Sequence, residues 1–330
     1  MKLKTTLLIS TFLFIFHSFS QVQIGSDILG EKPDDYANAQ AISQDGKTVA
    51  VIVPNAQGAD TTQRTGRARV YTFTGGNWTK IGSDIISDSL YDNYFRTLTM
   101  SGDGNVVAIG LRSGNVRVFG NVSGNFIQIG NDINGSFYSQ DGYSISLSYD
   151  GYILAIGGPE YDTLGFLNIG RVRVYNLQSG NWVQFGSDII GKTQHSESGT
   201  QVSLSSDGSA IAIGAPYMYH PSAYYSGTDP GHVCVYRFFG NNWTQIGSDI
   251  VGEALDDCFG STLSLSGDGN SIIIGGYGND AGGTNAGHAR VYKFLAGNWT
   301  QLGSDFDGRQ SYLNWGGVVS INYDGTIVTI

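Results

Sequence analysis

Six aspartates that recur in one short motif are the first candidates for chemistry in this sequence. Each follows Gly-Ser, or Gly-Asn in the third copy, and precedes Ile or Phe; they are Asp27, Asp84, Asp132, Asp188, Asp249 and Asp305. A ring of carboxylates could bind a metal or supply an acid–base pair. However, copies spread over successive repeats lie too far apart to meet at one substrate, and Asp commonly hydrogen-bonds the backbone of turns. The pattern favours a structural role.

Other catalytic and metal-binding residue types are scattered. The histidines outside the N-terminal segment show no metal-ligand spacing; they are His195, His220, His232 and His288. The chain contains no G-x-S-x-G nucleophile motif and no phosphate-binding P-loop. We therefore expect no metal site and no cofactor, and the sequence favours a binding protein over an enzyme. Cys234 and Cys258 form either one disulfide or two free thiols.

Composition and charge narrow the class of protein. Glycine accounts for 48 of the 330 residues, charged residues make up 14%, and the formal net charge is −10. Abundant glycine with few charges is typical of an all-β protein with many tight turns. An acidic chain without a basic stripe does not fit nucleic-acid binding.

The N-terminus resembles a secretory signal peptide, which we predict over residues 1–20. Two lysines precede an apolar run from Leu7 to Phe16, and small polar residues follow up to a cleavage site near Ser20 or Gln21. This run is too short for a stable membrane span, and no later segment is apolar enough to form one. We expect a secreted or cell-surface protein whose mature part, residues 21–330, contains no membrane span.

The aspartate motif belongs to a repeat of about 56 residues. Its copies start 48 to 61 residues apart, and a Ser-x-Asp-Gly turn, an Ala-Ile-Gly segment, a Val-x-Val-Tyr segment and Gly-Asn-Trp recur in the same order. Each unit contains four strand signals joined by turns, and in one unit the fourth predicted strand runs from Asn242 to Ile250. Four strands in each of about six units predict a β-propeller of four-stranded antiparallel blades. A parallel β-helix fits less well, because its turns are shorter and lack hairpin signals.

The repeat resembles the FG-GAP repeat of integrin-type β-propellers. Residues 259–292, "FGSTLSLSGDGNSIIIGGYGNDAGGTNAGHARVY", and "AIGAP" at 212–216 carry the resemblance, which extends over residues 22–330. Units linked by "WTQIGSDI" are similar to repeats in exported Bacteroidetes proteins. The resemblance implies the strand order, with the Ser-rich strand innermost and the tryptophan strand outermost. Integrin-type repeats often carry a calcium-binding loop between the first two strands. The corresponding turn here, residues 266–271, has one carboxylate, so we expect no calcium at this turn.

The repeat count predicts five complete blades, from about Ala39 to Phe306, and a partial sixth that stops inside its second strand. The chain therefore looks truncated at its C-terminus, with an intact parent of seven blades, or six as the alternative. The segment from Val22 to Ile28 is expected to pair with the last blade and close the ring. A ring left open would expose an unpaired edge.

Two further repeated positions are expected to pack blades together. Trp78, Phe126, Trp182, Trp243 and Trp299 begin the outer strands, where regular spacing favours packing of one blade on the next over sugar binding. The arginine of the Val-x-Val-Tyr segment is expected to make hydrogen bonds or stacking contacts between blades; its copies are Arg69, Arg117, Arg173 and Arg290. Cys234 replaces it in one unit.

Variable loops are the expected site of function, because the Asp-Gly turns on the opposite face are nearly identical between units. The candidate ligand-binding residues are Tyr161, Asp162, Tyr217, Tyr219, His220, Tyr224, Tyr225, Asp256, Asp257, Tyr312 and Trp315. The sequence therefore predicts a secreted or surface-displayed module that binds an extracellular protein or glycan through one face. The alternatives are an extracellular carbohydrate-active hydrolase or lyase that uses carboxylates in the central funnel, and a structural spacer of a larger surface protein.

Overall fold

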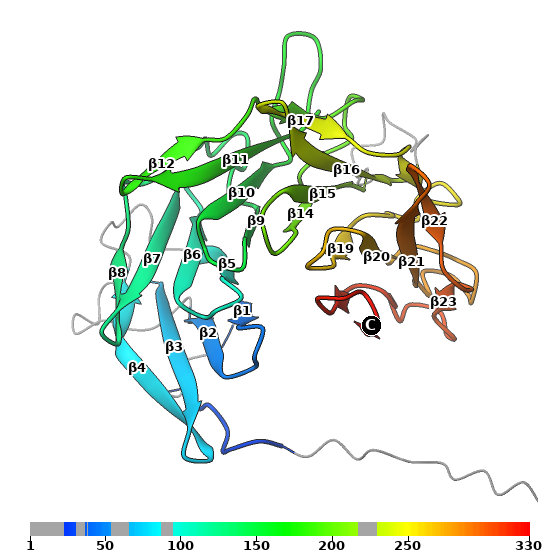
Figure 1. The fold of residues 1–330 in the computed structure, drawn as a ribbon. Helices are drawn as coiled ribbons and strands as arrows, with labels where there is room; N and C mark the ends of the chain where they lie inside the picture. The colour runs from blue at the N-terminus through cyan, green and yellow to red at the C-terminus, as the bar shows by residue number, and fades with distance from the viewer. Residues whose placement is uncertain (1–22, 31–36, 38, 54–65, 87–94, 217–229) are drawn as a thin grey trace, which may run out of the picture.

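The computed structural model describes residues 23–30, 37, 39–53, 66–86, 95–216 and 230–330, and every regular element in these ranges is a β-strand. The strands form antiparallel blades arranged around a central axis, with the first strand of each blade innermost (Figure 1). The predicted all-β propeller is thus confirmed. Among the described residues, no helix is long and apolar enough to cross a membrane.

Five blades have four main strands each. Blade 1 contains β1 (Ala39–Ile42), β2 (Thr48–Val53), β3 (Arg67–Thr74) and β4 (Asn77–Ile86). Blade 2 contains β5 (Phe95–Met100), β6 (Val106–Leu111), β7 (Val116–Val122) and β8 (Asn125–Gln128). Blade 3 contains β9 (Ser144–Leu147), β10 (Ile153–Gly158), β11 (Arg171–Gln178), β12 (Asn181–Gln184) and the short β13 (Ile189–Ile190).

The last two complete blades repeat the plan of blade 3. Blade 4 contains β14 (Gln201–Leu204), β15 (Ala210–Ala215), β16 (His232–Phe239), β17 (Asn242–Gln245) and β18 (Ile250–Val251). Blade 5 contains β19 (Thr262–Leu265), β20 (Ser271–Gly276), β21 (His288–Leu295), β22 (Asn298–Gln301) and β23 (Phe306–Asp307). A two-stranded sheet follows, made of β24 (Ser320–Ile321) and β25 (Val328–Thr329).

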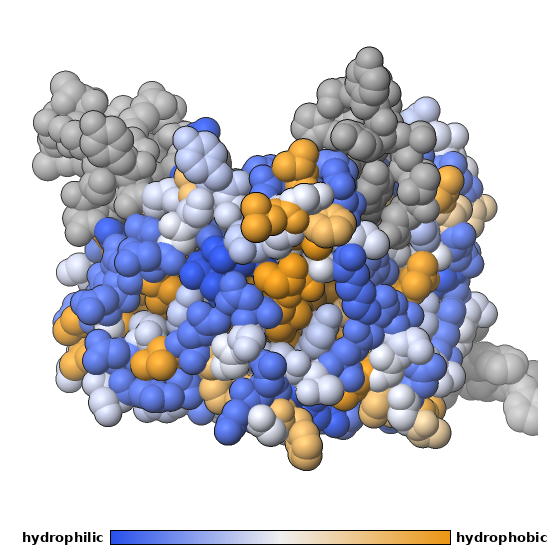
Figure 2. Space-filling model, turned by 90° about the horizontal axis from the view of Figure 1, so that it is seen from above, coloured by the Kyte–Doolittle hydropathy of each residue, from blue (hydrophilic) through white to orange (hydrophobic). Residues whose placement is uncertain are grey.

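The hydrophobic core lies between blades rather than inside them. One cluster joins Val233 and Val235 of β16 to Leu263, Ile272 and Ile274 of the next blade. Each blade therefore depends on its neighbours to bury its faces, as expected of a repeat architecture. On the outer surface, exposed apolar side chains form small groups separated by polar residues (Figure 2).

The Asp-Gly turns join the blades into a chain of backbone hydrogen bonds. The amide of Asp103 donates to the carbonyl of Tyr149 (3.1 Å), that of Tyr149 to Ser206 (2.8 Å), and that of Ser206 to Gly267 (2.9 Å). Inside the turn of each of the five blades a serine hydroxyl donates to the aspartate, as Ser205 does to Asp207 at 2.7 Å. These residues are used for architecture, which explains why the turn changes so little between units.

In blades 3, 4 and 5 the Gly-Ser-Asp motif interrupts the outer strand, whereas in blade 1 it lies inside β4, where the pairing with β3 shifts register between Ala68 and Val70. The predicted fourth strand over 242–250 is wrong in this respect, because β17 ends at Gln245 and the chain pairs with β16 again only at β18. Gly247 has a left-handed φ of 70°. The Gly-Ser-Asp motif thus forms a bulge in the outer strand, and its glycine adopts the left-handed conformation that other residues rarely adopt.

The bulge binds the outer strand of the next blade. Trp243 Nε1 donates to the Phe185 carbonyl (2.8 Å), and Trp299 Nε1 donates to the Ile246 carbonyl (3.1 Å). A Cβ on Gly186 would lie 2.8 Å from the Trp243 ring, so glycine is required at this position. The predicted inter-blade packing role of the tryptophans is confirmed.

The aspartate of the bulge turns back onto its own blade. Asp132 Oδ2 lies 2.9 Å from Arg117 Nε, and Asp305 Oδ2 lies 2.7 Å from Arg290 Nη2. These ion pairs of Arg117 and Arg290 lie within one blade and were not predicted. Arg173 does behave as predicted, since its Nη2 donates to the Asn134 carbonyl (3.3 Å), on the segment that enters its blade from the preceding one.

The described part of the N-terminal segment contacts the first blade. Ser26 N donates to Asn77 Oδ1 (2.9 Å), and Trp78 Nε1 donates to the Ile24 carbonyl (3.2 Å). In later blades Ser187 N and Ser248 N donate in the same way to Asn242 Oδ1 (3.1 Å) and Asn298 Oδ1 (2.8 Å). Among the residues the structure describes, the predicted pairing of this segment with the last blade is not formed, because its hydrogen-bonding partners lie on β4.

Candidate functional site

The predicted ligand-binding residues that the structure describes lie at one end of the blades, which we call the variable face. The variable face comprises the residues just before the first strand and just after the second strand of each blade, opposite the Asp-Gly turns. Tyr161 and Asp162 follow β10, and Asp256 and Asp257 precede β19. Tyr312 and Trp315 precede β24. The remaining candidates lie outside the described residues; they are Tyr217, Tyr219, His220, Tyr224 and Tyr225.

Several of these candidates hold their own loops. Tyr161 stacks on the guanidinium of Arg171, 4.2 Å from ring centroid to Cζ. Asp162 Oδ1 accepts a hydrogen bond from Asn168 N (2.7 Å). Asp257 is buried, where its carboxylate accepts from Ala254 N (2.9 Å) and Asn279 Nδ2 (3.1 Å).

Asp162, Asp256, Tyr312 and Trp315 are the predicted residues that remain exposed on this face. Tyr312 is 72% exposed and Trp315 is 41% exposed. These four side chains, unlike Asp257, are available for contact with a ligand.

The variable face presents one repeated backbone position with a different side chain in each blade. Gln140, Glu197, Cys258 and Asn314 occupy equivalent places before the inner strands, with φ values of 49°, 51°, 54° and 50°. Two residues later comes a glycine whose carbonyl lies against the second strand of the preceding blade. For example, a Cβ added to Gly157 would lie only 2.1 Å from the carbonyl oxygen of Gly199. This close contact fixes the backbone, so only the side chain varies.

A pocket of about 420 Å³ lies between blades 2 and 3 on the variable face. Its lining residues are Arg96, Arg112, Phe137, Tyr138, Gln140 and Glu160. Arg96 is the second residue of β5, and Arg112 directly follows β6. The inner hairpin of one blade therefore holds both guanidinium groups. Neither arginine was predicted from the sequence. The predicted binding residues lay mainly in the longer variable loops.

The Arg96 side chain is fixed by its surroundings. Its Nη2 donates to Gln140 Oε1, and its guanidinium lies 4.3 Å from the centroid of the Tyr143 ring. Burial lowers the pKa of Arg96, Tyr143 and Glu160 raise it, and Arg112 lowers it by the smallest of these effects. Arg96 and Arg112 line the pocket with Glu160 as the one acidic side chain, so the lining favours a bound anion.

Glu197 is a carboxyl group on this face whose pKa is strongly raised. Burial raises its pKa from 4.5 to about 7, and the charge of Glu160 contributes to the rise. Glu160 also interacts electrostatically with Arg96, so the carboxylates and the arginine pocket form one connected electrostatic region. A carboxyl group with a pKa near 7 can both accept and donate a proton at neutral pH.

The two cysteines are free, so the candidate disulfide between Cys234 and Cys258 is wrong. They belong to different blades, Cys234 to β16 and Cys258 to the segment that enters β19. Burial raises the pKa of the Cys258 thiol, and the carboxylates of Asp256 and Asp257 raise it as well. This thiol is therefore protonated at neutral pH and is not an activated nucleophile.

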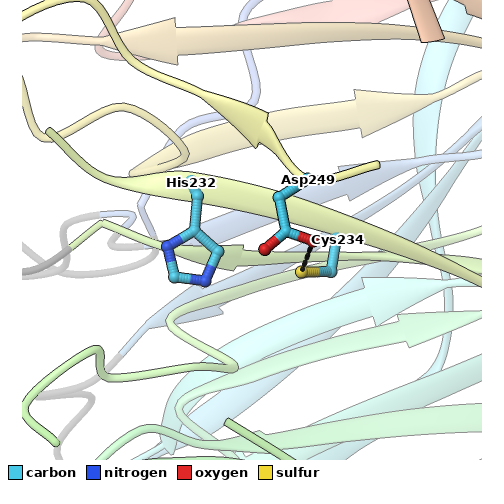
Figure 3. A group of neighbouring side chains, drawn as sticks. All are labelled: His232, Cys234 and Asp249. Carbon is cyan, nitrogen blue, oxygen red and sulfur yellow. Dashed lines mark hydrogen bonds between the residues drawn. The ribbon is translucent and has the colours of Figure 1, made fainter. Parts of the chain in front are cut away.

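A second group of polar side chains lies on blade 4. His232 and Cys234 project from the same side of β16, and Asp249, in the bulge before β18, points between them (Figure 3). One potential ligand atom from each residue lies within 4.8 Å of the others. The expectation of no metal-ligand cluster thus overlooked a geometric candidate. The available signal was His-x-Cys on a strand, where alternate residues share a face, next to the aspartate of the repeat.

Comparison with known proteins shows the fold and no family. No family model matches the chain, and no curated protein matches it. Among solved structures, the chain is similar to a proposed 6-phosphogluconolactonase from Bacteroides uniformis, with 13% identity and a TM-score of 0.58 over 88% of this chain and 76% of the other. It is also similar to a proposed 6-phosphogluconolactonase from Bacteroides fragilis, with 14% identity and a TM-score of 0.56 over 88% and 75% of the two chains. At this identity the likeness establishes that the chain adopts the same kind of β-propeller fold as these proteins.

Proposed function

We propose that this protein is a secreted or surface-displayed binding module that recognises an acidic carbohydrate through the pocket between blades 2 and 3. The observation that carries the proposal is the pair Arg96 and Arg112, held on one hairpin and lining a pocket of about 420 Å³. Carboxylate, sulfate and phosphate groups match guanidinium groups in charge and geometry.

The aromatic lining supports a sugar rather than a bare anion. Phe137 is 54% exposed and Tyr138 is 85% exposed, and both line the same pocket as the arginines. An aromatic ring offers a flat apolar surface to the C–H face of a sugar while the arginines bind its acidic group. Because the whole chain carries a net charge of −10, this local positive site also distinguishes the pocket from the surrounding surface.

Hydrolysis of a bound acidic sugar derivative is the second candidate function, and Glu197 favours it. With a pKa of about 7, Glu197 can accept a proton from a water molecule that attacks an ester or lactone carbonyl, and can return it to the leaving oxygen. The names of the two structural neighbours refer to a lactone of a phosphorylated sugar, which would suit the same two arginines. This candidate corresponds to the predicted alternative of an extracellular carbohydrate-active hydrolase.

The test is binding to matched oligosaccharides that differ only in acidic groups. We expect acidic forms to bind and neutral forms to bind at least about tenfold more weakly. Arg96→Gln and Arg112→Gln should each weaken binding of the acidic form by about 10- to 100-fold, which corresponds to the roughly 1.5–3 kcal/mol of a charge-assisted hydrogen bond.

The control is Lys47→Gln, which removes the same charge from an exposed position beside an Asp-Gly turn on the opposite face. It should leave binding unchanged. Equal binding of neutral and acidic sugars, or equal losses from Lys47→Gln and Arg96→Gln, would overturn the proposal. For the second candidate, Glu197→Gln should abolish hydrolysis of a sugar lactone while Arg-dependent binding persists.

A further inference from the structure

His232, Cys234 and Asp249 form a group that differs from its counterparts in the other blades at one position. Cys234, a potential metal ligand, stands where the other blades have arginine. In blade 5 the equivalent positions are His288, Arg290 and Asp305. There Arg290 pairs with Asp305 at 2.7 Å and also with Glu253, so a permanent cation already fills the space between the carboxylates. In blade 4 a cysteine replaces that arginine, which exchanges a cation for a potential thiolate ligand.

We propose that His232, Cys234 and Asp249 bind a thiophilic divalent cation, with Zn²⁺ as the best match. Imidazole nitrogen, thiolate sulfur and carboxylate oxygen are all established zinc ligands, and three protein ligands leave a fourth position for water. His232 is 8% exposed and Cys234 is 5% exposed, so the strand holds both ligands in fixed positions. The three ligand atoms already lie within 4.8 Å of one another, close enough to converge on one ion with small side-chain rotations (Figure 3).

Neighbouring polar groups orient the carboxylate, as is usual around metal sites. Gln245 Nε2 donates to Asp249 Oδ1 at 2.7 Å. The Cys234 thiol donates to the same oxygen at 3.4 Å. On metal binding this thiol loses its proton to solvent and the sulfur binds the cation directly.

Lys192 occupies the place where the cation would sit, and the proposal requires it to move. Its Nζ lies 2.5 Å from Asp249 Oδ1, and the side chain is 40% exposed. An ion pair this exposed contributes little to stability, and the flexible lysine stem can extend into solvent. Lys192 stands at the repeat position of Glu253, so a lysine balances the missing arginine until a metal replaces it.

Cobalt and zinc titrations of the purified full chain test the site. We expect one Co²⁺ per chain, with a sulfur-to-cobalt charge-transfer absorption in the near ultraviolet, and displacement of Co²⁺ by Zn²⁺. Competition with a chromophoric chelator then gives the zinc affinity. Cys234→Arg installs the residue found in the other blades, so the fold should persist while zinc affinity falls by more than the roughly 10–100-fold typical of losing an outer partner.

Two further variants make the result decisive. Cys258→Ser removes the other thiol and should leave the absorption band and the affinity unchanged. Lys192→Gln removes the competing cation and should bind zinc at least as tightly as the parent chain. Absence of the charge-transfer band, undiminished affinity in Cys234→Arg, or loss of binding in Cys258→Ser would each overturn the assignment.

Discussion

Replacing Glu197 by Gln should change stability in a pH-dependent way that follows from the burial of this carboxyl group. Its pKa rises from 4.5 to about 7 in the folded protein, first because of burial and second because of Glu160. Between those two pH values the folded protein binds more protons at this site than the unfolded chain. Stability contributed by this group therefore falls as pH rises from about 4.5 to 7.

The size of the effect follows from the shift. A difference of 7 − 4.5 = 2.5 pKa units, at about 1.4 kcal/mol each, amounts to about 3 kcal/mol at pH 8 and vanishes below pH 4. Glutamine has nearly the same shape, and Gln140 already occupies the equivalent left-handed position in blade 3 with φ 49° against 51°. The substitution therefore removes the charge without adding backbone strain.

Urea unfolding followed by tryptophan fluorescence at several pH values measures this effect. We expect Glu197→Gln to be up to about 3 kcal/mol more stable than the parent chain at pH 8 and nearly equal to it at pH 4. Glu160→Gln should give a smaller gain over the same pH range, because it removes only the second cause of the shift. A difference that does not vary with pH, or a loss of stability at pH 8, would refute the reasoning.

Two further substitutions test how the blades are held together. Trp243→Phe removes the donor to the partly buried Phe185 carbonyl and should cost about 1–3 kcal/mol in urea unfolding, whereas Trp78→Phe should cost less because its hydrogen bond is exposed; equal losses would contradict this. Gly214→Ala places a methyl group against the backbone of the next blade and should cost about 1–3 kcal/mol or more in thermal unfolding. Gly120→Ala meets only the Ile129 side chain at 3.4 Å and should be nearly neutral, so a comparable loss there would refute the close-contact argument.

The repeat predicted the blades well because its signals are local. Alternating strands and Asp-Gly turns lie within a few residues of each other, so the hairpins β14–β15 and β19–β20 follow directly from the sequence. The packing role of Trp182, Trp243 and Trp299 followed from their recurrence, because a position repeated in every unit must serve a contact repeated in every unit.

Most of the candidate site could not be predicted, because it depends on contacts between residues far apart in the chain. Arg96, Gln140 and Glu160 meet only because neighbouring blades bring the ends of their inner hairpins together. The same holds for Lys192 and Asp249, which are 57 residues apart. Sequence spacing identifies equivalent positions, but it does not show which equivalent positions of adjacent blades are in contact.

The outer-strand bulge was missed for a different physical reason. Gly-Ser-Asp-Ile follows Trp-Thr-Gln-Ile with no Asn-Gly or Asp-Gly turn between them, which predicts one continuous strand. In blades 3 to 5 the strand ends before the left-handed glycine. The aspartate after this glycine turns back to the third strand, as Asp132 does in blade 2 with Arg117 at 2.9 Å. A glycine that recurs at the same place in every unit was the signal for this break.

The repeated contacts between blades make each blade an interchangeable module. Tryptophan binds a backbone carbonyl of the preceding bulge, and the turn residues bind one another through backbone groups, as Tyr149 does with Ser206. Backbone partners are the same whatever side chains a blade carries. A blade could therefore be duplicated or exchanged during evolution, or by a protein engineer, without redesign of its neighbours. A single substitution at a position such as Glu197 would then change the chemistry of the variable face and leave the architecture intact.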